Sequence, residues 1–257
     1  MVLEYRTMLY LSSKKGGSFM ARKRTVSVHP PTGRNEDENL HTPLDRNRIV
    51  QTALQLLNES GLKELSMRKI ADKLQVKTAS LYYHVKDKEQ LMQLLLDQIC
   101  ETMAWPDSSL PWNKQLISWA EQFKHVLLSH RDAVELFNSG LGGGYERLTQ
   151  MEKLYGLFVT AGFKDDQIPW IASIVKNYVL GFAAEEARIY AFAGGVQTTP
   201  EELGEQYSRF FRQLPEERFP HLIRLASHTT NTNWAEEFEF GLGVLINGFA
   251  AKLQDQS

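Results

Sequence analysis

Five side chains able to hydrogen-bond crowd one short segment, where a helix built only for packing would carry apolar residues. They are Thr78, Ser80, Tyr82, Tyr83 and His84. Hydroxyls and amides at the start of a helix can bond the edges of nucleic-acid bases or phosphate oxygens, and a tyrosine can reach a phosphate or a thymine methyl group. The segment is therefore equipped to hydrogen-bond to a nucleic acid.

Two short helices joined by a tight turn must position these side chains. Ser66 is a suitable N-cap for the first helix, whose apolar residues recur at helical spacing as Met67, Ile70, Ala71 and Leu74. Residues 74–76 form the predicted turn, and Val76 and Leu81 would pack a second helix, over residues 77–84, onto the first. This is the layout of a helix-turn-helix, in which one helix braces another in the major groove of DNA.

Charge around the two helices favours the same interpretation. Between residues 63 and 88 there are seven Lys or Arg against three Asp or Glu, although the whole chain has a formal charge of −2. The next helix is predicted to begin after Asp87, with Gln90 in a capping-box position and Lys88 in the first turn, where a phosphate is favoured. Ordinary helical hairpins with solvated lysines share this spacing. Periodicity alone is therefore compatible both with DNA binding and with an ordinary helical hairpin.

Residues 44–103 resemble the DNA-binding domain of the TetR family of bacterial transcriptional repressors, in particular the subgroup of the tetracycline repressor. They keep the order of a first helix, a glycine stop at Gly61, the two-helix motif, the segment LYYHVKDK and a long connecting helix. The resemblance implies three base-reading residues, Arg68, Thr78 and Ser80. It also implies contacts to phosphate or the DNA backbone from Ser66, Tyr82, His84 and Lys88, and packing of Tyr83 at the groove edge.

One position departs from the family pattern, which usually has glycine where this chain has Gln75. If the turn requires a positive φ there, a residue with a side chain costs about 1 kcal/mol. We expect the motif to tolerate this cost with a slightly altered turn.

Composition is typical of a globular protein with one large or two small domains, at 257 residues, 42% hydrophobic and 23% charged. The single cysteine, Cys100, cannot form an internal disulfide and lies on an apolar helical stretch, which predicts a buried, inert thiol. Because no run of eighteen apolar residues occurs, we expect no membrane span and a cytoplasmic, nucleoid-associated protein. Metal-ligand histidine spacing, a nucleophile elbow and a phosphate loop are all missing, so we expect no enzyme, metal site or cofactor.

Residues 1–43 carry Pro, Gly, Ser and scattered charge without periodicity, which predicts a disordered extension. The Lys-Gly-Gly at residues 15–17 can be encoded by a purine-rich sequence resembling a ribosome-binding site, a short distance before Met20. We therefore expect natural translation to begin at Met20, with residues 1–19 an artefact. The basic residues 22–24 are either a DNA-contacting arm or a solvated tail.

Helical periodicity continues through the rest of the chain, which predicts an all-α fold. The first helix is expected to begin at Pro43 and end at Gly61. After a connecting helix over residues 87–103, further helices are predicted at 112–129, 131–138, 145–161, 165–191, 200–213 and 234–254. We expect a three-helix DNA-binding domain with its connecting helix over residues 44–103, and a helical effector-binding and dimerisation domain over residues 104–257.

Two of these helices carry apolar stripes, formed by Ile171, Val175, Tyr178 and Phe182, and by Phe238, Leu242, Leu245 and Phe249. Packing within one subunit explains each stripe alone. The resemblance implies dimerisation through a four-helix bundle of the equivalent helices, and two half-sites of DNA require two readers. We therefore expect a homodimer.

The middle helices combine large apolar side chains with few polar groups, as small-molecule pockets do, although ordinary cores share that composition. Candidate ligand contacts are Trp119, Phe123, Phe137, Trp170, Asn177, Tyr178 and Glu185. Phe123 and Glu185 match pocket residues of the tetracycline-repressor subgroup in kind, whereas Asn177 replaces a metal-binding histidine. This favours a bulkier, more apolar effector over a tetracycline–magnesium chelate.

The sequence thus predicts a ligand-responsive repressor that binds a palindromic operator as a homodimer and is released by a small apolar effector. Two alternatives stay open. One is a constitutive or architectural DNA-binding protein without an effector, which would need no short palindrome. The other is a small-molecule carrier that has lost DNA binding.

Overall fold

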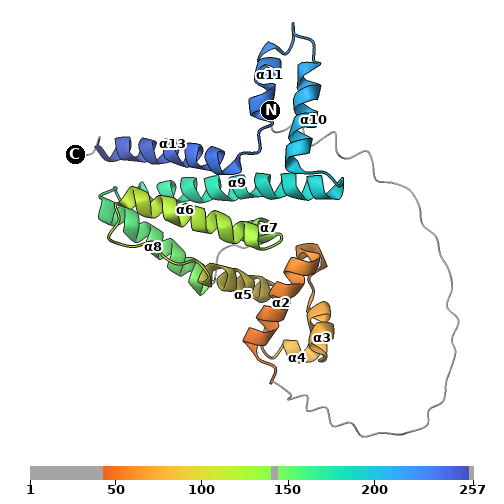
Figure 1. Ribbon diagram of the computed structural model, residues 1–257. Coiled ribbons are helices and arrows are strands. Elements are labelled where there is room, and N and C mark those ends of the chain that lie inside the picture. Colours follow the sequence, from red (N-terminus) through yellow and green to blue (C-terminus); the bar gives the residue numbers. More distant parts are fainter. Residues whose placement is uncertain (1–42, 140–143, 255–257) are drawn as a thin grey trace, which may run out of the picture. The chain divides into compact units, whose positions relative to one another are not determined.

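The computed structural model describes residues 43–139 and 144–254, and all regular structure in these ranges is helical (Figure 1). This agrees with the predicted all-α class. The expectations for residues 1–42, including the translation start and the basic residues 22–24, lie outside the described residues. Among the described helices, none is long and apolar enough to cross a membrane.

The helix-turn-helix region consists of α2 (Arg46–Ser60), the short 3-10 helix η1 (Leu62–Glu64), α3 (Met67–Leu74), α4 (Thr78–Leu81) and α5 (Lys88–Glu101). The predicted start of the first helix at Pro43 is wrong. Asp45 is the N-cap, because its side chain accepts a hydrogen bond of 2.7 Å from the backbone N–H of Arg48. A side-chain acceptor satisfies an otherwise unpaired backbone amide, which a proline cannot do.

The second helix of the motif is shorter than the predicted range 77–84. Only Thr78–Leu81 is α-helical, and the backbone N–H groups of His84 and Val85 both donate to the carbonyl of Leu81 at 2.9 Å. Two donors on one carbonyl tighten the chain into a turn. Leu81 and Val85 are fully buried and hold this turn against the core, so the tyrosines beside them face outward.

The turn between α3 and α4 has a positive φ, so the condition considered for Gln75 is met. Gln75 follows α3 with φ 58° and ψ 36°, the left-handed region. Its backbone N–H donates to the carbonyl of Asp72 at 3.2 Å, and that of Val76 donates to Ala71 at 3.0 Å. These bonds close the end of α3, so the turn is maintained at the expense of an unfavourable backbone conformation.

Replacing Gln75 by glycine is expected to stabilise the protein by about 1 kcal/mol. Glycine relieves the left-handed strain, and the greater entropy of the unfolded glycine chain offsets part of that gain. Urea unfolding of Gln75→Gly and Gln75→Ala measures the effect, since alanine removes the side chain but keeps the strain. Equal stability of the two variants would show that the turn is unstrained.

The C-terminal region begins with α6 (Trp112–Ser129), α7 (Ala133–Ser139), α8 (Tyr145–Ala161) and α9 (Ile168–Gly195). It continues with α10 (Pro200–Arg212), α11 (Pro220–Arg224), α12 (Ala226–Thr229) and α13 (Trp234–Gln254). The helices α11 and α12 were not predicted, and α9 extends four residues past its predicted end at residue 191. At the start of α10, Thr199 and Glu202 form a capping box around Pro200.

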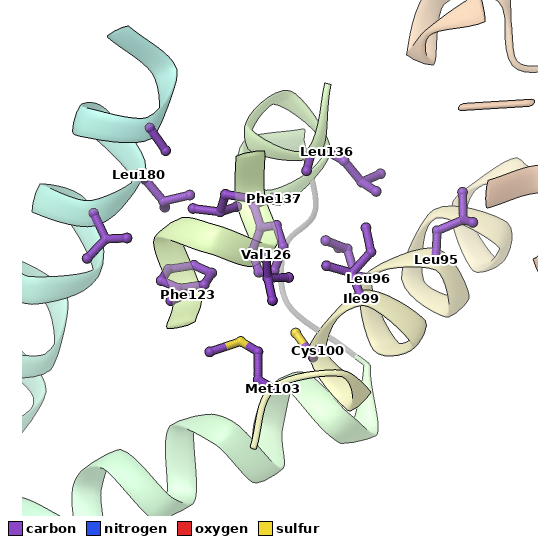
Figure 2. Packing of buried hydrophobic residues seen from close by; sticks show 14 of the residues in the cluster. Leu95, Leu96, Ile99, Cys100, Met103, Phe123, Val126, Leu136, Phe137 and Leu180 are labelled. Carbon is purple, nitrogen blue, oxygen red and sulfur yellow. The ribbon is translucent and has the colours of Figure 1, made fainter. Parts of the chain in front are cut away.

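One continuous core connects α5 with α6, α7 and α9 (Figure 2). The connecting helix α5 contributes Leu95, Leu96 and Ile99, all buried. Cys100 lies beside them at 2% exposure, and burial raises the pKa of its thiol to about 12. The predicted burial of Cys100 is confirmed, and with so high a pKa we expect almost no thiolate near neutral pH.

Both predicted apolar stripes lie mainly within the core of the chain itself. Ile171 and Val175 on α9 are buried, as are Phe238 and Leu242 on α13. The hydroxyl of Tyr178 donates to the carbonyl of Phe238 at 2.8 Å, joining the two helices, which run side by side (Figure 1). Any surface that α9 and α13 offer to a second chain must therefore be a different stripe.

Candidate functional site

The residues predicted to read DNA lie on the outer surface of α3 and α4. The Arg68 side chain is 86% exposed, and Tyr83 is 88% exposed. Tyr82 is also exposed, whereas Thr78 and Ser80 are partly buried. Met67, Ile70 and Leu81 are buried beneath them, so the apolar side of the motif faces the core and its polar side faces solvent. This arrangement presents several donors on one accessible surface.

Local capping fixes the start of α3. The hydroxyl of Ser66 accepts a hydrogen bond of 3.3 Å from the backbone N–H of Lys69, which confirms Ser66 as the N-cap. One turn further on, Arg68 Nε lies 3.9 Å from a carboxylate oxygen of Asp72. This ion pair is highly exposed and therefore weak, so the guanidinium is available to a stronger partner.

The end of α4 and the start of α5 are anchored to neighbouring elements. Arg46 Nε donates to the backbone carbonyl of His84 at 3.3 Å, joining α2 to the end of the motif. Asp87 caps α5 by accepting from the backbone N–H of Gln90 at 2.8 Å. The Gln90 side chain accepts from Lys86 N–H at 2.6 Å instead of the predicted Asp87 N–H. Lys88 is exposed in the first turn of α5, where its charge adds to the helix N-terminus.

Three of the predicted ligand residues come together in a buried aromatic cluster, formed by Trp119, Phe123 and Phe137. The ring centroids of Trp119 and Phe123 are 5.3 Å apart, and so are those of Phe123 and Phe137. Figure 2 shows Phe123 and Phe137 facing the interior beside Met103. The indole Nε1 of Trp119 is buried without a hydrogen-bond partner, which gives this cluster an unused donor.

The other predicted ligand residues, all on α9, are placed differently. Tyr178 is half-buried, and burial raises the pKa of its hydroxyl. Trp170 and Asn177 are exposed, and the exposed Glu185 forms an ion pair with Arg188. These three side chains do not join the aromatic cluster. Residues 170, 174 and 177 lie on one side of α9, whereas residues 171, 175 and 182 face the core. Since α9 is apolar on more than one side, its sequence alone does not show which side is buried.

An ion pair that the sequence did not predict lies largely inside the C-terminal region. Lys124 Nζ on α6 is 3.0 Å from a carboxylate oxygen of Glu186 on α9. The two side chains are only 16% and 13% exposed. A signal was available for Lys124, since it continues the helical spacing of the buried Leu116 and Ala120. A charge on the buried side of a helix indicates a paired or functional group.

The turn between α6 and α7 is hydrogen-bonded to the C-terminal end of α2. A carboxylate oxygen of Asp132 accepts from the backbone N–H of Leu62 at 2.8 Å. Arg131 donates from its backbone N–H to the Asn58 side chain at 3.1 Å and from its guanidinium to the Glu59 carbonyl at 3.1 Å. We call these contacts the α2 junction. They tie the motif directly to the helices that carry the aromatic cluster.

His130 makes the α2 junction sensitive to pH. The Asn58 amide nitrogen lies 3.4 Å from His130 Nδ1, which accepts a hydrogen bond only when the imidazole is neutral. Burial lowers the pKa of His130, so its contribution to stability is present above the unfolded pKa near 6.5 and is lost as pH falls through the folded value.

Between pH 7.5 and 5.5, we expect the melting temperature of His130→Gln to fall less than that of the wild type. The exposed His125 provides the control: His125→Gln should retain the wild-type fall, and identical slopes for all three proteins would contradict the prediction.

The connecting helix α5 has its own links to both regions. Both carboxylate oxygens of Asp97 cap the start of α8, accepting from the backbone N–H groups of Tyr145, Glu146 and Arg147 at 3.1, 3.0 and 3.4 Å. On its other side, α5 contacts α2, where Gln51 donates to Gln98 at 3.0 Å. A displacement of α8 or α5 would therefore be transmitted to the helix-turn-helix.

A separate hollow of about 450 Å³ lies beside α10 and α12. Its lining is largely polar, with Glu201, Ser208, Arg209 and Thr230 among its residues, and none of the predicted ligand residues lines it. In the described ranges, no group of three His, Cys, Asp or Glu side chains is arranged to hold a metal ion.

Comparison with known proteins places both regions. Residues 49–95 match the family described as bacterial regulatory proteins, tetR family, and residues 106–253 match the tetracyclin repressor-like C-terminal domain. An HTH-type transcriptional regulator of Saccharopolyspora erythraea is 34% identical over 145 residues, which span 56% of this chain and 61% of that relative, less than two thirds of its length. The tetracycline repressor protein class E of Escherichia coli is 28% identical over 211 residues, covering 81% of this chain and 92% of the repressor.

Solved structures of proteins with bound partners have a similar fold. ActR from Streptomyces coelicolor, in complex with actinorhodin, has a TM-score of 0.74 at 28% identity and covers 82% of this chain and 97% of its own. BioQ, with its double-stranded DNA operator, has a TM-score of 0.53 at 30% identity and covers 60% and 94%. With a polar helix-turn-helix surface, a helical C-terminal region and family matches to both, the chain belongs to the tetR family of bacterial regulatory proteins, as a DNA-binding transcriptional repressor with a ligand-binding domain and not an enzyme.

Proposed function

We propose that this repressor binds a palindromic operator as a homodimer and is released by a small, largely apolar effector. The observation that carries the proposal is the separation of buried apolar side chains from exposed polar ones in α3 and α4. Met67, Ile70, Ala71 and Leu81 are buried, while Arg68 and Tyr82 are exposed and Thr78 and Ser80 lie beside them at partial exposure. A solvated hairpin needs no such set of base-reading and phosphate-binding groups.

The proposal divides the chain into a DNA-binding part over residues 44–103 and an effector-binding and dimerisation part over residues 104–257. The aromatic cluster of Trp119, Phe123 and Phe137 is the proposed apolar part of the effector site. Proteins of similar fold bind multi-ring molecules: ActR has been solved with actinorhodin, and a TetR variant from Acinetobacter baumannii with minocycline. These relatives support an effector with several rings.

Exposed apolar side chains on α9 and α13 support the proposed homodimer. They are Trp170 and Ile174 on α9, and Phe240 and Val244 on α13. Single exposed apolar residues are normal, but several on two adjacent helices indicate an interface. When two chains pair these helices, a four-helix bundle forms and each chain presents one reading motif to one half-site.

The proposed response requires that effector binding move the reading motif. Two sets of contacts connect the C-terminal part to the reading motif. One is the α2 junction, through Asp132, and the other is α5, through the Asp97 cap of α8. DNA has a fixed repeat, so a change in the separation of the two motifs would cost the second half-site most of its contacts. A ligand drives this only through different affinities for the two states, and a hundredfold release needs about 2.7 kcal/mol of coupling.

Arg68→Ala is expected to relax discrimination at one operator base pair by about 1–3 kcal/mol, because it removes a base contact. Lys88→Ala is the matched comparison, since Lys88 is proposed to contact a phosphate. It should weaken binding to all sequences alike and lower the salt slope by about one per half-site. Binding to operators with single base changes, at several salt concentrations, separates the two effects. An unchanged base preference in Arg68→Ala would show that Arg68 does not read a base.

Linkage tests the effector response itself. By reciprocity, operator DNA must weaken binding of a confirmed ligand by the same factor by which the ligand weakens operator binding. Titrations of that ligand with and without operator should therefore give different affinities. Equal affinities would leave a constitutive DNA-binding protein.

A further inference from the structure

The side chain of Lys124 is 16% exposed, and its ammonium group lies between aromatic rings. Its Nζ is 4.9 Å from the ring centroid of Phe182 and 4.8 Å from that of Phe238. Glu186, its ion-pair partner, is equally buried. Desolvating two charges is costly, and an apolar residue of similar volume is often as stable at such a position. The charge therefore calls for a role beyond packing.

Hydrogen-bond donors outnumber acceptors around this group. The ammonium has three N–H donors, and the Glu186 oxygen 3.0 Å away is not aligned as a hydrogen-bond acceptor. The indole Nε1 of Trp234 is also buried without a partner, and its ring packs edge-on against Phe182 at 5.9 Å. Buried donors without partners are rare in native proteins, and a ligand that supplies acceptors would satisfy the Trp234 indole and bind the Lys124 ammonium as well.

We propose that Lys124, Phe182, Trp234 and Phe238 form an anion-binding subsite, and that the effector is a multi-ring aromatic molecule carrying one acidic group. This inference rests on the proposed function, because it specifies the chemistry of the effector site. The acidic oxygens of the ligand bind Lys124 Nζ in place of Glu186 and accept from Trp234 Nε1. The rings of the ligand pack on Phe182 and Phe238.

Exchange of one anion for another explains how such a ligand is selected. Lys124 keeps a negative partner throughout, whereas Glu186, only 13% exposed, must turn towards solvent when it is displaced, because a buried carboxylate without a partner is costly. A neutral ligand of the same shape offers no acidic oxygen and leaves the donors unsatisfied. Release of Glu186 also breaks the link between α6 and α9, which gives the bound state a different arrangement of the core helices.

Two fluorescent probes with the same ring system test the proposal on the full chain. 1-Anilinonaphthalene-8-sulfonate carries an acidic group, and N-phenyl-1-naphthylamine is the same molecule without it. The wild type should bind one sulfonate probe per chain at least tenfold more tightly than the neutral probe. Lys124→Met should abolish this preference by weakening the sulfonate probe alone, and Lys124→Arg should restore much of it. Lys153→Met, a change of an exposed lysine on α8, should leave both affinities unchanged.

Glu186→Gln separates ligand binding from a purely structural role. It removes the competing carboxylate, so the sulfonate probe should bind several-fold more tightly; loss of a structural ion pair would instead weaken binding of both probes. Trp234→Phe, which keeps a ring and removes Nε1, should weaken only the sulfonate probe. Equal affinity of the wild type for the two probes, or weaker sulfonate binding by Glu186→Gln, would overturn the proposal. Operator affinity measured with saturating sulfonate probe distinguishes the two inferences: selective binding at Lys124 without any change in operator affinity supports the subsite and contradicts the proposed effector response.

Discussion

A chain carrying Phe240→Glu and Val244→Glu is expected to be folded and monomeric, and to lose at least a hundredfold in operator affinity. The two side chains are 75% and 56% exposed in the single chain, so charge there costs little in folding. In a four-helix dimer interface, the same charges are desolvated without partners. A monomer can hold only one half-site, which removes the gain from binding two linked half-sites.

Sedimentation and operator titration of this double variant measure both effects. Val159→Glu on α8 is the matched control, because Val159 is as exposed as Val244 but does not lie on α9 or α13. It should remain dimeric with unchanged operator affinity. A double variant that stays dimeric would place the interface on another surface of the chain.

Gly144→Ala is expected to destabilise the protein by about 2–3 kcal/mol. A Cβ at this position would lie 2.0 Å from a carboxylate oxygen of Asp97, so the carboxylate must leave the start of α8. Three backbone N–H groups then lose their charged acceptor, and such capping bonds contribute about 1–3 kcal/mol. Chemical unfolding measures the loss.

A matched glycine in the same helix provides the control. Nothing lies within 4 Å of a Cβ built at Gly156, so Gly156→Ala should stabilise α8 by up to about 1 kcal/mol. Combining Gly144→Ala with Asp97→Ala should cost little more than Asp97→Ala alone, because both remove the same cap. Additive losses in the double variant would show that the glycine acts independently of Asp97.

The helix-turn-helix was predictable because its signals are local. Ser66 and Asp87 are N-cap residues that accept a hydrogen bond from a backbone N–H three residues later, a pattern that is visible in the sequence. Both caps are present in the structure. The left-handed turn at Gln75 was likewise predictable from the resemblance. The predicted start at Pro43 is wrong because two N-terminus signals lie close together and the side-chain cap at Asp45 prevails.

The effector region was only partly predictable, because its geometry depends on contacts between distant residues. Periodicity placed Phe123 and Phe137 inside, and they are buried. It could not determine which side of the apolar helix α9 faces the core. Trp170 and Asn177, which were predicted to contact the ligand, therefore had no reliable placement, and in the structure they lie exposed. The pairing of Lys124 with Glu186, and the cap from Asp97 to a helix 48 residues later, join elements that local sequence patterns do not relate.

Selection of random duplex DNA by the full-length chain tests the central claim most directly. The exposed readers on α3 and α4, presented twice by a dimer, predict that the enriched sequences form an inverted repeat. Its half-site centres should lie about one helical turn apart, roughly 34–36 Å, since both motifs must meet the same face of the duplex. Enrichment of no sequence at all, with binding governed only by salt, would contradict a palindrome-reading repressor and indicate a protein that coats or bends DNA.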